Sequence, residues 1–267
     1  MKIIDCFTFF NELDMLLFRL EYLFDTIDYF VLVEATYSHK GMSKPLFYSE
    51  NLKKFEKYKN KIIHVIVDDM PNTENNWDNE KFQRICINRG LMKIELNKED
   101  LIIISDIDEI PDKNTLVNIS INDNQVYSLK QDMYYYNLLT KQQIPWYAAK
   151  ICKYMTFCNY DSNAARIRLL DNYNFGEGVK IPRISKGGWH LSYFGSNEFI
   201  KNKINTIVEG GPLWKKMYGC DVSTDIISEK KRKGLDLYGR NIKFLIVELG
   251  KNTYLPEGYE KFTFLYD

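Results

Sequence analysis

The chain has 267 residues, 45% of them hydrophobic and 15% aromatic, which indicates a packed globular protein of one large or two small domains. Its 36 basic and 36 acidic residues balance, so net charge favours neither nucleic acid nor an anionic membrane as a partner. The five cysteines are scattered without a C-x-x-C pair, which argues against a zinc site and a disulfide framework.

The start of the chain and its hydropathy bear on location. Residues 1–5 contain an acidic side chain and do not resemble a signal peptide. No apolar run approaches the ~20 residues needed to cross a bilayer. We therefore expect a soluble, cytoplasmic protein without a membrane span.

The first part of the chain alternates between strand and helix patterns. The predicted strands cover residues 2–9, 29–35 and 61–67, and the predicted helices cover residues 13–24, 49–58 and 77–96. Asn11 is the expected N-cap of the first helix. Such alternation predicts a mostly parallel sheet with helices on its faces.

Residues 101–111 form the stretch around which the rest is organised. A buried strand there runs into the carboxylates of Asp106, Asp108 and Glu109, and Pro111 is expected to end it. Along an extended chain Asp106 and Asp108 point the same way, ~7 Å apart. Carboxylates at the carboxyl end of a parallel strand lie where open α/β sheets bind ligands. Because like charges this close repel, the pattern predicts a hard divalent cation at Asp106 and Asp108.

After Pro111 the pattern changes. Aromatic, partly alternating runs over residues 125–138 and 146–157 predict antiparallel strands, and a short strand is predicted over 187–194. Ser196 is the expected cap of a helix that ends before Gly210-Gly211-Pro212, and a last helix covers residues 221–233. Without a linker or repeat, the chain reads as one α/β domain with two unlike halves.

Two further residues extend the predicted site. Arg84 shares a helix face with Glu80 and Asn88, and the helix can aim it at the end of the acidic strand, where it would grip a carboxylate or phosphate. The alternative is a surface salt bridge between Arg84 and Glu80. His190, after a glycine pair and Trp189, would complete the metal shell, or else serve as a hydrogen-bonded core histidine.

Other acidic residues stay open. Glu34 closes the second strand at the same sheet edge and would hydrogen-bond a ribose, unless it is only a solvated strand end. Four late acids are candidate bases, and spacing does not choose among them: Asp132, Glu177, Glu209 and Asp225. The basic run at residues 230–233 is expected to complement a helix dipole, or else to face a diphosphate.

Five pieces of sequence occur in a recognisable order over about residues 3–240. They are Phe9-Phe10-Asn11-Glu12-Leu13 with Arg19-Leu20, Phe30 to Ala35, Glu80 to Arg84, Ser105 to Pro111, and Gly187 to Ser192 with Phe194-Gly195. Together they resemble glycosyltransferase family 17, the family of the β-1,4-mannosyl-glycoprotein 4-β-N-acetylglucosaminyltransferases.

The resemblance implies a GT-A-like single domain over residues 1–267. Residues 1–115 would form the nucleotide-sugar-binding half and residues 116–267 the acceptor and metal-completing half. It also implies inverting transfer of a sugar, N-acetylglucosamine being expected, from a UDP-sugar to a glycan hydroxyl, with no nucleic acid involved.

The resemblance also suggests roles for residues of the site. Mn²⁺ or Mg²⁺ would be held by Asp106, Asp108 and His190. The donor would contact Glu34, Arg84, Asp106 and Asn11. Glu209 is the favoured catalytic base, with Asp132 and Asp225 as alternatives.

Two other functions fit part of the pattern. A phosphatase of the haloacid dehalogenase type also runs a strand into Asp-x-Asp and would use Asp106 as its nucleophile, but its pattern usually has Thr or Val where this chain has Ile110. A non-catalytic module would bind a nucleotide-sugar or carbohydrate on some of the 19 tyrosines and four tryptophans. Turnover of p-nitrophenyl phosphate or of a UDP-sugar separates the three.

Overall fold

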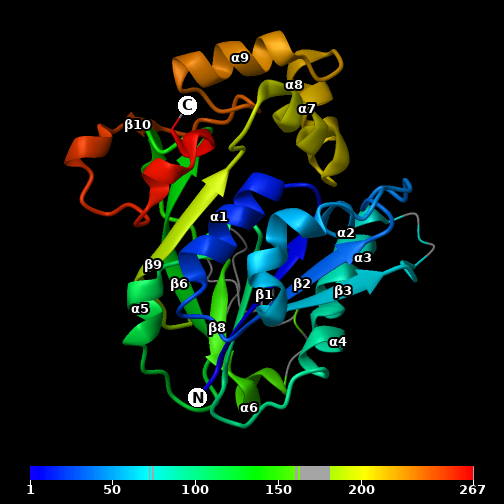
Figure 1. Ribbon diagram of the computed structural model, residues 1–267. Helices are drawn as coiled ribbons and strands as arrows, with labels where there is room; N and C mark the ends of the chain where they lie inside the picture. Colours follow the sequence, from blue (N-terminus) through cyan, green and yellow to red (C-terminus); the bar gives the residue numbers. More distant parts are fainter. Residues whose placement is uncertain (72, 74, 160–161, 163–180, 267) are drawn as a thin grey trace.

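The computed structural model describes residues 1–71, 73, 75–159, 162 and 181–266, and in it helices pack around a central sheet (Figure 1). The first half alternates between strand and helix, as predicted. Its elements are β1 (Ile3–Phe9), α1 (Leu13–Leu23), β2 (Tyr29–Ala35), α2 (Phe47–Glu50), the 3-10 helix η1 (Leu52–Lys61), β3 (Ile62–Val67), α3 (Asn76–Ile85), α4 (Ile87–Leu91), β4 (Leu101–Asp106) and β5 (Glu109–Pro111).

Strands β4, β1, β2 and β3 pair in that order and are all parallel. The chain moves outward from β1 through β2 to β3 and then returns to place β4 on the other side of β1. The strand order therefore reverses between β1 and β4. In open α/β sheets such a reversal leaves a ligand-binding crevice at the carboxyl ends of the two strands.

Strand β1 shows how the two faces of the sheet are covered. Successive side chains of a strand point to opposite faces. Phe7 packs in the cluster that contains Leu16 of α1, whereas Cys6 packs in the cluster that contains Leu91 of α4. Helix α1 therefore covers one face of the parallel strands and α4 the other, so their carboxyl ends remain accessible.

The second half extends the same sheet. Its elements are α5 (Lys113–Val117), β6 (Tyr127–Tyr135), β7 (Thr140–Gln142), β8 (Lys150–Lys153), α6 (Tyr154–Phe157), β9 (Arg183–Ser192), α7 (Asn197–Thr206), α8 (Gly210–Tyr218), α9 (Thr224–Lys233), β10 (Phe244–Ile246) and the 3-10 helices η3 (Leu249–Lys251), η4 (Tyr259–Lys261) and η5 (Thr263–Leu265). Strand β8 is antiparallel to β4 and β6, while β9 is parallel to β6 and antiparallel to β5. The predicted α/β class, with a parallel first part and a mixed second part, is confirmed.

Helices α7, α8 and α9 form a group beyond the end of β9 (Figure 1). Their apolar residues, among them Ile204, Trp214 and Ile227, share a cluster with Tyr135 of β6. Ser196 caps α7 by accepting a hydrogen bond from the N–H of Phe199, as predicted, and Gly234 ends α9 in the left-handed conformation. The group is thereby anchored next to the carboxyl ends of the parallel strands.

Several local predictions were wrong at element ends. The helix predicted over residues 77–96 is divided at Cys86 and ends at Leu91. The segment Gly210-Gly211-Pro212 begins α8, because a proline in the first helical turn needs no N–H partner.

Three other segments also differ from the predictions. Glu12, not Asn11, is the N-cap residue of α1, and its carboxylate accepts from the N–H groups of Phe10 and Asn11. Residues 49–58 fall in α2 and η1 instead of one α-helix. Within residues 146–157 only β8 is a strand, and α6 follows it directly.

Gly90 lets α4 approach the sheet closely. A Cβ atom at this position would lie 2.3 Å from Cγ1 of Val31 and 3.0 Å from Cγ2 of Val65. By contrast, a Cβ atom at Gly250 in η3 would meet nothing within 4 Å. The first glycine is therefore required by packing and the second is not.

We predict that Gly90→Ala lowers the free energy of unfolding by about 1–3 kcal/mol, because overpacking the α4 interface outweighs the gain in helix propensity. Gly250→Ala is the matched control and should change it by less than about 0.5 kcal/mol. Urea denaturation of the three proteins measures both values. Equal stability of Gly90→Ala and the parent would show that α4 does not depend on this close approach.

Candidate active site

The crevice between β1 and β4 opens into a cavity of about 260 Å³. Thr8 of β1 lies opposite Asp106 of β4 in the sheet register, and both line the cavity. Arg84 of α3, His190 of β9 and Lys203 of α7 line it as well. Elements from both halves of the chain therefore converge where the strand order reverses.

A buried arginine fixes the chain immediately after β4. Arg19 of α1 is fully buried, and its Nη2 and Nε atoms donate to the carboxylate of Asp5 at 2.6 and 2.8 Å. Its Nη1 donates to the carbonyl oxygens of Asp106, Ile107 and Glu109 at 2.9, 3.0 and 3.0 Å. The planar guanidinium can satisfy these acceptors together because its N–H groups point in fixed directions.

Glu109 also holds the turn that follows β4. This side chain is fully buried, and its Oε2 accepts a hydrogen bond from the backbone N–H of Asp106 at 2.8 Å. Its Oε1 accepts from the indole N–H of Trp146. Of the three carboxylates after β4, Glu109 is therefore used inside the protein to hold the turn.

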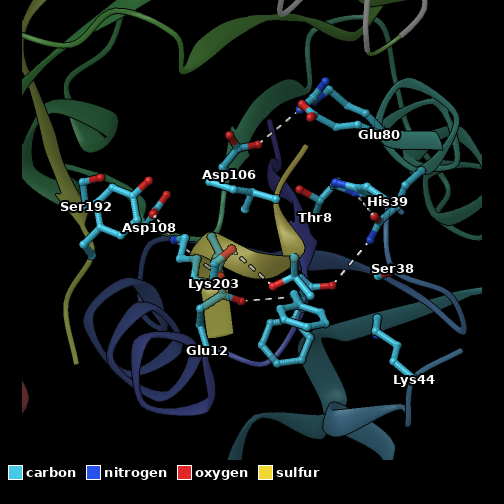
Figure 2. Close-up of a pocket in the computed structure, with 18 of the residues that line it drawn as sticks. Thr8, Glu12, Ser38, His39, Lys44, Glu80, Asp106, Asp108, Ser192 and Lys203 are labelled. Carbon is cyan, nitrogen blue, oxygen red and sulfur yellow. Dashed lines mark hydrogen bonds and ion pairs between the residues drawn. The ribbon is translucent and has the colours of Figure 1, made fainter. Parts of the chain in front are cut away.

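Asp106 and Asp108 do not continue an extended strand. Strand β4 ends at Asp106 and a turn follows, which lets the carbonyl groups of Asp106, Ile107 and Glu109 all reach the guanidinium of Arg19. The prediction that Asp106 and Asp108 point the same way assumed an extended strand through both residues, and the strand ends before Asp108. Figure 2 shows Asp106 on the Glu80 side of the cavity and Asp108 beside Lys203.

The two carboxylates have different partners. Asp106 is 37% exposed at its side chain, and its Oδ1 lies 3.5 Å from Nη2 of Arg84. Asp108 is only 10% exposed; its Oδ2 accepts from Nζ of Lys203 at 2.8 Å, and its Oδ1 lies 3.5 Å from Nε2 of His190. Asp106 thus faces the first half and Asp108 the second.

Lys203 is a buried cation between two acids. Its side chain is 15% exposed, and Nζ lies 2.8 Å from Asp108 and 3.6 Å from Oε1 of Glu12. Burial alone would lower the pKa of Lys203, but Asp108 and Glu12 outweigh it and hold this pKa above its ordinary value. Burial alone would raise the pKa of Asp108, but Lys203 and His190 outweigh it and hold this pKa well below its ordinary value.

The donor atoms of Asp108 and His190 fit a divalent cation. Two ligands at ~2.1 Å from one ion in neighbouring positions lie about 3 Å or slightly more apart, and Oδ1 of Asp108 and Nε2 of His190 lie 3.5 Å apart. Asp106 lies apart from this pair, against Arg84. Consistently, the described residues contain no group of three or more His, Cys, Asp or Glu side chains arranged as a metal centre. The fit is therefore to an ion with two protein ligands that takes others from a substrate, as Mg²⁺ commonly does.

The predicted donor-binding residues are not all at this cavity. Arg84 reaches Asp106 at the end of the acidic strand. It also pairs with Glu80 at 2.8 Å, and because it is only 3% exposed this pair is not a surface salt bridge. Glu34 is fully buried, accepts from the N–H of Tyr48 and contacts His64, and it is absent from the described cavity lining. Asn11 lines a neighbouring second cavity instead.

The three candidate bases are not among the described residues at the two cavities. Glu209 is exposed at the N-terminus of α8, and Asp225 is exposed in the first turn of α9. Asp132 of β6 pairs with Lys141. The catalytic role of all three stays a prediction. The fourth acid, Glu177, lies outside the described residues.

Sequence reasoning missed Glu12, His39 and Lys203 as site residues. All three line the cavity, and His39 also contacts Oε1 of Gln83 at 2.8 Å. A signal existed for Lys203, since it follows Phe199 by four residues on a capped helix and so shares its face. No sequence pattern around His39 indicated that this residue lines the cavity.

Comparison with known proteins identifies a family. The sequence profile described as glycosyltransferase family 17 matches residues 1–176. The human β-1,4-mannosyl-glycoprotein 4-β-N-acetylglucosaminyltransferase is 24% identical over 294 residues, which cover 100% of this chain and 55% of that protein. The rat protein of the same name is 25% identical over 237 residues, covering 80% of this chain and 44% of that protein. The chain thus spans about half the length of the curated relatives it matches.

Two solved structures resemble the chain weakly. An active-site mutant of LgtC covers 99% of this chain and 95% of its own length, with 11% identity and a TM-score of 0.36. The bifunctional glycosyltransferase WbbM covers 49% of this chain and 23% of its own, with 10% identity and a TM-score of 0.28.

Within the described ranges, no helix combines the length and the apolar character that crossing a bilayer would require.

We predict that Arg19→Leu lowers the free energy of unfolding by about 3–5 kcal/mol, because it leaves the Asp5 carboxylate buried without its partner. The matched control is Arg89→Leu, which removes an arginine that grips Asp69 with two hydrogen bonds of 2.7 Å at the surface. An exposed pair of this kind contributes less than about 1 kcal/mol. Urea denaturation compares the two variants, and equal losses would contradict the structural role of Arg19.

Proposed function

The chain belongs to glycosyltransferase family 17, and from this membership we propose that it transfers N-acetylglucosamine from a UDP-sugar to a hydroxyl group of a glycan. The names of the curated relatives support the choice of sugar and of a mannosyl acceptor. Membership in this family also favours a glycosyltransferase over the phosphatase and the non-catalytic module.

The observation that carries the proposal is the charge arrangement at the reversal of strand order. A diphosphate is an anion, and positively charged side chains stabilise the charge that develops on it as it leaves. Arg84, Lys203 and Lys44 line the cavity at the carboxyl ends of β1 and β4 together with the carboxylates of Glu12, Glu80, Asp106 and Asp108, so the proposal relies on a bound divalent cation as well as on the basic side chains. Arg84 is suited to grip a phosphate at two points because its guanidinium is planar.

The end of the cavity away from Asp108 suits the nucleoside. Tyr37 lines it there and is 41% exposed, so its ring has a free surface for a base. Ser38 and His39 follow on the same loop, and Figure 2 shows them on the side of the cavity away from Asp108. This arrangement would direct the donor sugar toward Asp108 and His190.

The proposal includes a divalent cation at Asp108 and His190. A bound Mn²⁺ or Mg²⁺ would supply Lewis-acid neutralisation of the leaving diphosphate. Asp108 and His190 would hold it, while Arg84 orients the phosphates and Lys203 keeps Asp108 ionised. Asp106 would bind donor hydroxyl or phosphate-bound water through its exposed carboxylate.

We predict that UDP with Mn²⁺ raises the melting temperature, because a ligand of the folded state stabilises it by about 2.7 kcal/mol at one hundred times its Kd. For a chain of this size that is a rise of about 5 °C or more. Asp108→Asn should lose most of this rise, whereas Asp25→Asn, at an exposed residue beyond α1, should keep it. Differential scanning fluorimetry measures the shift, and an unchanged response of Asp108→Asn would refute the metal assignment.

We also predict Mn²⁺-dependent release of UDP that is at least tenfold faster from UDP-N-acetylglucosamine than from UDP-glucose or UDP-galactose. The pocket must discriminate the acetamido group for this difference to appear. Coupled detection of UDP gives the rates, with EDTA-treated enzyme as the control. Hydrolysis of p-nitrophenyl phosphate without release of UDP from any of the sugars would contradict the proposal.

A further inference from the structure

A second cavity, of about 600 Å³, adjoins the first. We propose that it is the acceptor subsite, that it holds a sugar ring of the glycan against Phe199 and Phe264, and that Glu12 takes the proton of the attacking hydroxyl. The inference rests on the proposed transfer reaction and adds to it the acceptor site and the base.

The two cavities share a wall. Glu12, Asp108 and Lys203 line both of them. In a transfer reaction the acceptor oxygen must come within about 3–3.5 Å of the anomeric carbon of the donor, so the two subsites have to adjoin. Here they adjoin at the side chains that face the proposed diphosphate position, and not at a remote surface.

The second cavity offers aromatic surface to a sugar. Phe199 comes from α7 and Phe264 from η5, and both rings are partly exposed. The C–H faces of a sugar ring pack against aromatic rings, while its hydroxyl groups need polar partners at the edge. Asp14 and Lys54, which pair at 2.7 Å with side chains 68% and 35% exposed, supply such groups at the rim.

Gly195 sets the position of the Phe199 ring. Its φ is +130°, which favours glycine, and a Cβ atom there would lie 2.9 Å from Cδ1 of Phe199. The ring therefore rests directly against the backbone that follows β9. Phe194, the residue before Gly195, is 4% exposed and also lines the cavity.

Glu12 is held less tightly by its cation than Asp108, because Nζ of Lys203 lies 2.8 Å from Oδ2 of Asp108 but 3.6 Å from Oε1 of Glu12. Both oxygens of Asp108 face cationic or metal-binding groups, Lys203 on one side and His190 on the other. Oε2 of Glu12 accepts from the N–H groups of Phe10 and Asn11 at 3.3 and 3.1 Å, which fixes the carboxylate. Its Oε1 lies 3.6 Å from Nζ of Lys203, at the shared wall.

The step balances without another reactant. The acceptor oxygen forms a bond to the anomeric carbon as its proton passes to Oε1 of Glu12. The bond from the anomeric carbon to the diphosphate oxygen breaks, and its electron pair leaves with UDP. The proposed inversion requires the acceptor hydroxyl to attack the anomeric carbon from the face opposite the leaving diphosphate.

The subsite is tested by measuring, with an NMR titration, how tightly methyl β-D-mannopyranoside binds to the protein loaded with UDP and Mn²⁺. Phe199→Ala and Phe264→Ala should each weaken the mannoside at least tenfold and alter the Kd of UDP less than threefold. Leu213→Ala, an exposed apolar residue of α8 outside both described cavity linings, is the matched control and should bind as the parent does. Parent-like affinity in both phenylalanine variants, or no binding by the parent, would overturn the subsite.

The base is tested with Glu12→Gln, which keeps the size of the side chain. Transfer of N-acetylglucosamine to the mannoside should fall about 100-fold or more, while the Kd values of UDP and mannoside change less than threefold. A rate within tenfold of the parent would overturn the role of Glu12. A parent that neither releases UDP nor transfers would refute the proposed function itself, whereas a fully active parent with parent-like variants would refute only this inference.

Discussion

The geometry of the site depends on one buried ion pair, between Arg19 of α1 and Asp5 of β1. Burying two charges is unfavourable unless their hydrogen-bonding groups are satisfied. Arg19 meets this condition by also donating to three carbonyl groups of the turn after β4 and to Oγ of Ser105. The first strand, the first helix and the acidic turn therefore form one unit, and the directions of Asp106 and Asp108 follow from it.

A second charge cluster joins the two halves of the chain. Lys203 arrives on α7, whose start is fixed by the Ser196 cap and whose inner face packs with Trp214. Its ammonium group lies between Asp108 and Glu12, and these three side chains line both cavities. In the proposed reaction one cavity holds the donor and the other the acceptor, and the side chains that line both lie where the bond is exchanged.

The sequence predicted most of the parallel half and part of the site. Short apolar runs such as Tyr29–Ala35 were located because a strand buried on both faces needs little else to be recognised. Arg84 reaches Asp106 at the end of β4, as helix periodicity and the order of elements indicated, while its part in donor binding stays a prediction. The turn at Ile107 was missed, since it depends on Arg19, a residue distant in sequence. Glu12 and Lys203 were missed for the same reason: their roles arise from contacts between the two halves.

In the proposed site, the turn held by Arg19 presents Asp108, with His190, to a cation that contacts the donor diphosphate. The most direct measurement is the anomalous scattering of Mn²⁺ in a crystal of the complex with UDP. We expect a manganese peak within coordination distance of Asp108 and His190, with the diphosphate between it and Arg84. A manganese peak elsewhere, or UDP bound away from the ends of β1 and β4, would contradict it.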